Sequence, residues 1–382
     1  MNKTALYDQH RALAAKMTDF HGWDMPLYYT SILDEHKAVR QSLGVFDISH
    51  MGQVLVTGPD AVATLNHVTV SDISQVGIGR ACYTMMLNPE GGIIDDIIIY
   101  RLGETEYLVI VNCGNRVIDV EWLAAHRHGQ TTITDISEGR SMLAVQGPKA
   151  SHVLEQLLDA KVSGLGRFDI APIRTMGPDA CIARTGYTGG DGFELFVPDR
   201  HARRLWDAIL SEAKPVGALP VGLGARDTLR VEAGLRLYGT DMDTTTTPIE
   251  AGLDWTVAMG KPDFIGKTVL VEQKQRGVAK RLVGFELALG PMPRTGNELT
   301  VDGTRVGRVT SGAFSPILGK PLGMGYVEPA YAKPGTALTL TVRSQRYTAT
   351  VVKLPFWKPD VKRAALTGGA ATTERLTDVR TP

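Results

Sequence analysis

The sequence predicts an α+β protein with antiparallel sheets, followed by a separate all-β domain. Three predicted strands follow one another through short connections and lead into a helix, at 81–88, 92–100, 106–112 and 115–126. This order is typical of an antiparallel α+β unit rather than of a doubly wound parallel sheet. No Gly-x-Gly-x-x-Gly motif follows a strand, which disfavours a dinucleotide-binding fold. From about Lys280 the chain changes to short strands with frequent Gly and Pro, which indicates an all-β domain.

Composition excludes several functional classes. At 382 residues the chain is long enough for two or three domains. Lys+Arg and Asp+Glu are both 41, so there is no basic footprint for nucleic acid, and no apolar run of about 18 residues indicates a membrane span. Residues 1–22 resemble neither a signal peptide nor a transit peptide. The three cysteines are far apart and form no CxxC pair, so we expect reduced thiols, no disulfide, no metal and a cytoplasmic location.

The first elements follow from local signals. Ser31, with an acid three residues later, has capping-box spacing and predicts a helix that ends at Gly44. His50 is interpreted as a satisfied polar residue of a packed turn rather than as a general base. A strand is predicted at 53–57, and a short helix capped by Asp60 runs to residue 68.

Two adjacent carboxylates, Asp95 and Asp96, interrupt an otherwise apolar strand that runs from residue 93 to residue 100. Side chains alternate across a strand, so the two carboxylates point to opposite faces. Because both faces are otherwise apolar, at least one Asp should lie in or beside the interior, where a carboxylate needs hydrogen bonds, a charge partner or a function. Either a structural or a catalytic role is compatible with this pattern alone.

A glycine-rich turn at 184–192 precedes a strand at 193–197. Its four glycines suit a hairpin loop. However, Tyr187 lies inside the turn, and apolar residues surround Glu194 in the strand. An acid beside a glycine loop is well placed to bind the N–H edge of a flat heterocycle. Asp199 is then predicted to cap an amphipathic helix.

A loop at 222–234 enters a helix that carries four charged residues of alternating sign. For Asp227, Arg230 and Glu232 we predict an internal ion-pair network that fixes the helix. Arg226 lies on the entry turn, where its guanidinium can make two parallel hydrogen bonds to a ligand carboxylate.

Seven motifs occur in the order of one protein family. They are Phe-Asp-Ile-Ser-His-Met-Gly at 46–52, Gly-Gly-Ile-Ile-Asp-Asp at 91–96, Arg-Thr-Gly-Tyr-Thr-Gly at 184–189, Gly-Leu-Gly-Ala-Arg-Asp at 222–227, Leu-Tyr-Gly at 237–239, Pro-Ile-Glu-Ala-Gly at 248–252 and Thr-Ser-Gly-Ala-Phe-Ser-Pro at 310–316. The chain resembles the T-protein family, the aminomethyltransferases of the glycine cleavage system, from about Thr4 to Trp357. In that family a Glu usually stands where this chain has Gly190, for which we expect altered loop flexibility.

The resemblance implies a three-domain, cloverleaf-like ring with tetrahydrofolate in its central opening. The implied division is a first folate-binding domain from 1–53 plus 137–244, a ferredoxin-like second domain from 54–136 plus 245–279, a jelly-roll or barrel-like domain at 280–358, and a flexible tail at 359–382. The implied reaction moves the one-carbon unit from the aminomethylated lipoyl arm of H-protein to tetrahydrofolate. It releases ammonia and forms 5,10-methylenetetrahydrofolate.

The resemblance also assigns roles to residues of this chain. Asp96, the second acid of the pair, matches the catalytic residue, which is hydrogen-bonded toward folate N10, and Asp95 is then structural. The matching folate contacts are Met51, Tyr83, Asn112, Tyr187, Glu194, Arg226 and Trp357.

Two relatives on the same fold are the alternatives. One is a tetrahydrofolate-dependent demethylase of sulfonium compounds or aryl methyl ethers, but such enzymes diverge in the early and Asp-Asp regions. The other is the non-enzymatic folate-binding protein of iron–sulfur cluster maintenance, marked by a Lys-Gly-Cys-Tyr motif. Here Cys82 and Tyr83 lack the preceding Lys-Gly. The aminomethyltransferase is therefore the preferred prediction.

Overall fold

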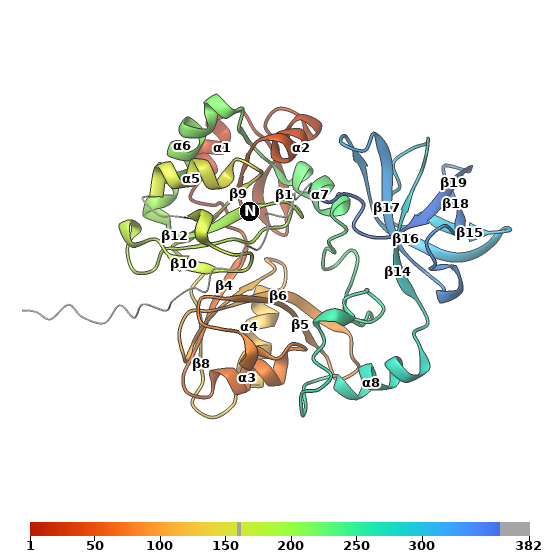
Figure 1. Cartoon of the computed structure of the whole chain (residues 1–382), viewed down its shortest axis with the longest axis horizontal. Helices are drawn as coiled ribbons and strands as arrows, with labels where there is room; N and C mark the ends of the chain where they lie inside the picture. Colours follow the sequence, from red (N-terminus) through yellow and green to blue (C-terminus); the bar gives the residue numbers. More distant parts are fainter. Residues whose placement is uncertain (159–161, 360–382) are drawn as a thin grey trace, which may run out of the picture.

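The computed structural model describes residues 1–158 and 162–359. Within these residues the chain forms three lobes in a cloverleaf arrangement (Figure 1): a six-stranded sheet, a five-stranded sheet and a closed six-stranded barrel. The predicted α+β class with a C-terminal β-barrel is confirmed. The division into domains stays a prediction, with which the strand content of each sheet is compatible. The predicted tail lies outside the described residues, except for Pro359.

The six-stranded sheet has the order β10-β11-β12-β9-β3-β13. Its strands are β3 (Gly44–Asp47), β9 (Arg140–Gln146), β10 (Ile170–Pro172), β11 (Cys181–Ala183), β12 (Gly192–Pro198) and β13 (Leu219–Pro220). The pairing is antiparallel except that β13 runs parallel to β3. Sequence analysis predicted antiparallel sheets only and did not predict this parallel edge strand. It is two residues long, which is too short to show a strand pattern in the sequence.

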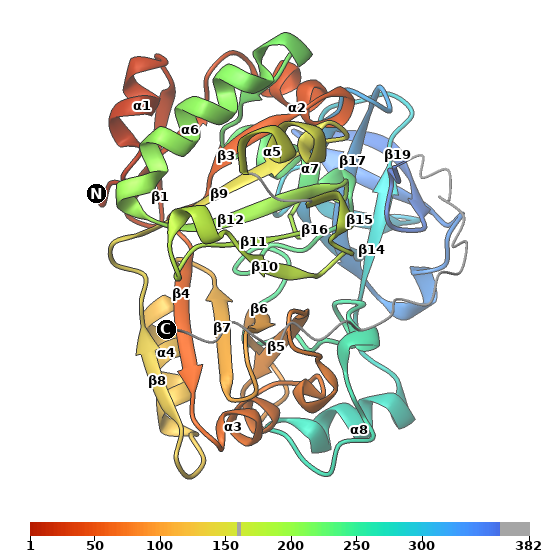
Figure 2. The same cartoon turned by 60° about the vertical axis from the view of Figure 1, so that its left-hand side comes forward.

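Four helices cover the side of this sheet that faces away from the second lobe (Figure 2). They are α1 (Tyr7–Ala12), α2 (Ile32–Gln41), α5 (Ala150–Leu158) and α6 (Asp199–Ala213). The core on this side includes Trp206 of α6 and Phe193 of β12, both fully buried. A ribbon of β1 (Lys16–Phe20) and β2 (Trp23–Tyr28) lies beside them.

The five-stranded sheet has the order β5-β6-β7-β4-β8. Its elements are β4 (Gly52–Thr57), α3 (Ala61–Val68), β5 (Ala81–Leu87), β6 (Ile93–Arg101), β7 (Glu106–Val111), α4 (Arg116–Ala125) and β8 (Thr132–Asp135). Ile97 and Ile99 of β6 belong to the sheet's own core. Tyr100 points the other way and meets Phe196 of the first sheet edge to face, with ring centroids 5.3 Å apart. Strand β6 therefore lies at the junction of two lobes.

Of the side-chain caps predicted at Ser31, Asp60 and Asp199, only the one at Ser31 forms. Ser31 caps α2, because its Oγ accepts from the backbone N–H three residues later at 3.1 Å. The helices after Asp60 and at Asp199 exist, but neither carboxylate caps its helix. Asp60 instead accepts from the backbone N of Gln130 at 2.7 Å, and Asp199 accepts from Ser141 Oγ at 2.6 Å. Each carboxylate serves a partner that is distant in sequence.

The barrel closes in the order β14-β17-β16-β15-β18-β19. Its strands are β14 (Arg281–Glu286), β15 (Glu298–Val301), β16 (Thr304–Ser315), β17 (Lys320–Val327), β18 (Ala337–Val342) and β19 (Gln345–Val352). Sequence analysis missed β15, a four-residue strand whose pairing with β16 contains a register shift. Two further helices, α7 (Leu223–Glu232) and α8 (Lys267–Arg276), lie outside the barrel. None of the helices in the described residues is long and apolar enough to cross a membrane.

Helix α7 joins the first lobe to the barrel through buried ion pairs. Glu232 accepts from Arg40 Nε at 2.6 Å and from Ser315 Oγ of β16, and it lies 3.2 Å from His36 Nε2. Two residues earlier, Arg230 donates to Asp227 at 2.8 Å and also pairs with Asp241. The predicted ion-pair network on this helix is confirmed.

Replacing Glu232 by Gln should lower the free energy of unfolding by about 3–5 kcal/mol, because the buried Arg40 cation is left uncompensated. Denaturant titration of the variant against wild type measures this. The matched control is Glu286→Gln, which breaks the Lys320 pair of the barrel, where both side chains are about one-third exposed. That change should cost less than about 1 kcal/mol. Equal losses in the two variants would contradict a special role for the α7 junction.

Candidate active site

The two carboxylates of β6 point to opposite sides, as the alternation of a strand predicts. Asp95 is fully buried beneath α4, whereas Asp96 is partly exposed. Asp95 accepts from the backbone N of Asn112 at 3.0 Å, from Asn112 Nδ2 at 2.8 Å and from Asn115 Nδ2 at 3.0 Å. The helix predicted from residue 115 does begin there, but the Asn115 side-chain amide donates to Asp95 and does not cap the helix. Asp95 thus ties β6 to the end of β7 and the start of α4.

Asp96 is held by two neutral donors. Tyr83 OH donates to its Oδ2 at 2.9 Å, and Asn112 Nδ2 donates to its Oδ1 at 3.0 Å. Burial, and next the charge of Asp95, raise the pKa of Asp96 to about 7 against the opposing effect of these hydrogen bonds. A carboxylate that titrates near neutral pH is suited to accept a proton during catalysis.

Tyr83 also carries an aromatic neighbour that sequence analysis missed. Its ring stacks with Trp255 at 6.2 Å between centroids and 26° between planes. The Trp255 side chain is 71% exposed. The only available signal was its position three residues after the 248–252 motif. The stack supports the hydroxyl that holds Asp96.

Glu194 lies buried in β12 and receives both of its hydrogen bonds at one oxygen. Thr185 Oγ1 donates to Oε2 at 2.6 Å, and Tyr100 OH donates to it at 3.3 Å. Burial raises the pKa of Glu194. Among the described residues Oε1 has no hydrogen-bond donor, so it remains available to a ligand N–H group. Sequence analysis missed Thr185 and Tyr100 as partners because they come from the turn and from β6.

Arg226 is a partly buried cation without an anion. Within the described residues its guanidinium makes no hydrogen bond or ion pair, and it lies 4.7 Å from the centroid of the Tyr187 ring. Burial lowers the pKa of Arg226, opposed by Tyr187 and Glu194. The Tyr187 hydroxyl donates to the backbone carbonyl of Arg236, which fixes the ring. An uncompensated guanidinium of this kind favours binding of a carboxylate or carbonyl oxygen.

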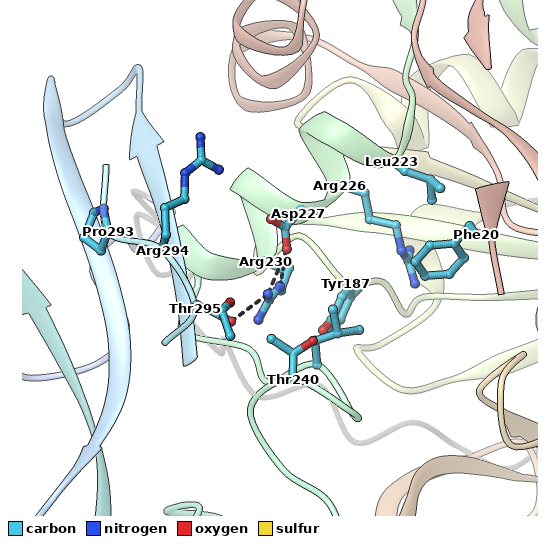
Figure 3. A pocket seen from close by; sticks show the side chains of 13 residues that line it. Phe20, Tyr187, Leu223, Arg226, Asp227, Arg230, Thr240, Pro293, Arg294 and Thr295 are labelled. Carbon is cyan, nitrogen blue, oxygen red and sulfur yellow. Dashed lines mark hydrogen bonds and ion pairs between the residues drawn. The ribbon is translucent and has the colours of Figure 1, made fainter. Parts of the chain in front are cut away.

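Arg226 and Tyr187 line a cavity of about 290 Å³ between α7 and the barrel (Figure 3). Its remaining lining residues are Phe20, Leu223, Asp227, Arg230, Leu237, Thr240, Pro293, Arg294, Thr295, Ser311 and Gly312. Asp96, Tyr83, Asn112 and Glu194 do not line it. Tyr187 links the two groups electrostatically, because the charge of Asp96 contributes to raising its pKa.

The last two predicted residues lie at the edge of this group. Met51 packs against the apolar cluster between the two sheets, which includes Leu229 of α7. Trp357 lies further out, with Arg40 3.7 Å from its ring centroid and the glycine loop beside it at Gly190. The structure thus brings Asp96, Tyr83 and Asn112 together directly, and places Trp357 at the α7 junction.

His50 departs from its interpretation as a satisfied turn residue. It is buried, and its Nδ1 has no hydrogen-bond partner among the described residues. Burial lowers its pKa to about 3, with the Arg226 charge adding to the effect. Its ring meets Phe20 edge to face at 5.4 Å. At neutral pH His50 is therefore an uncharged part of the wall beside Arg226.

Known proteins share this architecture and these motifs. The family model described as the GCVT N-terminal domain matches residues 6–261, and that of the glycine cleavage T-protein C-terminal barrel domain matches 280–358. The aminomethyltransferase of Halothermothrix orenii is 42% identical, over 93% of this chain and all of its own. That of Streptomyces avermitilis is 45% identical, over 93% and 97%. The crystal structure of glycine cleavage system aminomethyltransferase T from Bartonella henselae aligns with a TM-score of 0.89 and 36% identity, covering 94% of this chain and 98% of that one. The chain belongs to the glycine cleavage T-protein family.

Proposed function

We propose that this aminomethyltransferase takes the one-carbon unit from aminomethyl-dihydrolipoyl H-protein and passes it to tetrahydrofolate, releasing ammonia and forming 5,10-methylenetetrahydrofolate. Its relatives are named aminomethyltransferases over nearly the full length of the chain. The observation that carries the proposal is Asp96, a partly exposed carboxylate with a pKa near 7 that Tyr83 and Asn112 hold in place. We also propose that the enzyme acts in the cytoplasm, where its free cysteines stay reduced.

The residues present fit a folate. Tetrahydrofolate would supply the two nitrogens that receive the carbon. Glu194 would accept from the N–H donors of the pterin through its vacant Oε1. Arg226 would donate to a folate oxygen or to the glutamate tail, since its guanidinium has no acceptor within the described chain. Tyr187 presents its ring beneath that guanidinium. Met51 and Trp357 would provide apolar contact at the margins.

Asp96 would act on the nitrogen that attacks the carbon. In its ionised form it orients the N–H group, stabilises the positive charge that develops as the new C–N bond forms, and accepts the proton. Tyr83 and Asn112 keep its two oxygens fixed, so little reorganisation is needed during the reaction. The low polarity of the surroundings strengthens each of these interactions.

The rate should depend on the ionisation of Asp96. We expect kcat to fall about tenfold per pH unit below about pH 7, as protonation removes the acceptor. Loss of the fold would not cause this fall. The pKa of Asp96 in the folded state lies above its ordinary value of 3.8, so protonation across the interval between them favours the folded state. A pH–rate profile measures this fall of kcat on the acid side, and circular dichroism at each pH checks that the protein remains folded. A rate that stays flat down to about pH 5 would contradict the assignment.

The direct test supplies aminomethylated H-protein and tetrahydrofolate and follows 5,10-methylenetetrahydrofolate and ammonia. Stoichiometric formation of both products supports the proposal. Folate binding without product, together with methyl transfer from a sulfonium or aryl methyl ether donor, would replace it with a demethylase. Folate binding without turnover on either donor would indicate a non-enzymatic folate-binding protein.

A further inference from the structure

A third carboxyl group lies behind the active-site pair. Asp119, in the first turn of α4, is fully buried. Within the described residues neither of its oxygens has a hydrogen-bond donor. It lies against Asp95, close enough for a hydrogen bond between the two carboxyl groups. A buried ionised carboxylate without any donor is costly, so this arrangement needs an explanation.

The groups around Asp119 offer no positive charge. Asp95 and Asp96 approach from β6, and Tyr238 approaches from the loop after α7. In the described chain no lysine, arginine or histidine forms an ion pair with Asp119 or with Asp95. Two ionised carboxylates cannot share such a site, and one proton between them turns a repulsion into a hydrogen bond.

The hydrogen bonds decide which carboxyl group holds the proton. Asp95 accepts from three N–H donors of Asn112 and Asn115, and these stabilise its ionised form. Asp119 receives none. Burial and the neighbouring Asp95 charge raise the pKa of Asp119 to about 11, in the same direction as the geometry.

We propose that Asp119 is a neutral carboxylic acid that donates a hydrogen bond to the ionised Asp95, and that it serves as a positioning residue for Asp96. The link runs through Asn112. The Nδ2 of Asn112 donates both to Asp95 Oδ1, at 2.8 Å, and to Asp96 Oδ1, at 3.0 Å. With Asp119 as its donor, Asp95 stays an ionised acceptor that holds this amide in place. Without that donor, Asp95 takes up a proton itself and releases the amide.

The protonation of Asp119 can be measured without any turnover. Infrared difference spectra of the full chain at about pH 9 can detect the Asp119 carboxylic acid without a contribution from Asp96. At that pH Asp96, with its pKa of about 7, is ionised. Wild type minus Asp119→Asn should show the carbonyl stretch of a protonated carboxylic acid, whereas wild type minus Asp96→Asn should not. Absence of that band from the Asp119→Asn difference spectrum would overturn the proposal, whatever reaction the enzyme catalyses.

The positioning role rests on the proposed function of Asp96 and needs a separate measurement. Asp119→Asn keeps a donor to Asp95, so kcat should stay within about twofold of wild type. Asp119→Leu has similar volume but no donor. Its kcat should fall roughly tenfold, the loss of one hydrogen bond to a charged group. The acid limb of the pH–rate profile of Asp119→Leu should also move to lower pH. A protonated Asp95 no longer repels the charge of Asp96, so the pKa of Asp96 falls.

Tetrahydrofolate binding and denaturant titration establish that each variant is folded, and Asp119→Ala takes the place of the Leu variant if that one does not fold. An unmoved acid limb in the variants without a donor, or an equal shift in Asp119→Asn, would refute the positioning role. Wild type without aminomethyltransferase turnover would instead refute the proposed function and leave the infrared result standing.

Discussion

Replacing Asp96 by Asn should lower kcat by about 10²–10⁴-fold, the usual contribution of a positioned general base. The amide is isosteric and can still lie between Tyr83 and Asn112. It cannot take a proton or stabilise positive charge as a carboxylate does. Because the shape of the side chain is kept, tetrahydrofolate affinity should change by no more than a few-fold. Steady-state kinetics with aminomethylated H-protein, together with a folate titration, measures both quantities.

The matched control is Asp179→Asn, which makes the same chemical change at an exposed position of the first lobe. It should leave kcat and folate affinity unchanged. A loss in Asp96→Asn that appears mainly in folate affinity, with kcat retained, would indicate a binding role instead. Retention of both would remove Asp96 from the mechanism.

Replacing Arg226 by Met should weaken tetrahydrofolate binding by roughly 10–150-fold, the equivalent of one charge-assisted hydrogen bond of about 1.5–3 kcal/mol. The free protein should not lose stability, because the partly buried guanidinium of Arg226 has no anion to give up within the described residues. Met keeps much of the length and apolar volume over the Tyr187 ring. Folate titration and denaturant unfolding of the free protein together give this signature.

Arg203→Met, at an exposed position of α6, is the matched control and should change neither quantity. Arg226→Lys should recover only part of the affinity, since an ammonium lacks the planar fork of the guanidinium. Unchanged folate affinity in Arg226→Met would exclude this residue from the site. A large loss of stability in the free protein would show that Arg226 serves the fold.

The sequence alone determined the features that depend on neighbouring residues. The two-residue period of a strand separated Asp95 from Asp96, and the structure shows one fully buried and the other partly exposed. Capping-box spacing placed the start of α2 at Ser31. The change near Lys280 to short predicted strands with frequent Gly and Pro located the barrel. Periodicity, capping and turn chemistry act over a few residues, so their signals survive in a single chain.

Only the tertiary structure decided which polar groups meet. Asp60 and Asp199 have the chemistry of helix caps, yet Gln130 and Ser141 use them instead. The side chain of Asn115 likewise serves Asp95. Nothing local distinguishes a carboxylate that will cap a helix from one that will find a distant donor, because both satisfy the same need for hydrogen bonds.

The same reason explains what sequence analysis missed around the site. Trp255 supports Tyr83, and Asp119 lies behind Asp95, across 172 and 24 residues of sequence respectively. The parallel pairing of β13 is also set by its neighbour β3 rather than by its own two residues. Local periodicity determined the strand that carries the catalytic candidate. The environment that sets the charge of Asp96 exists only once β5, which carries Tyr83, and β7, which leads into Asn112, have paired with β6.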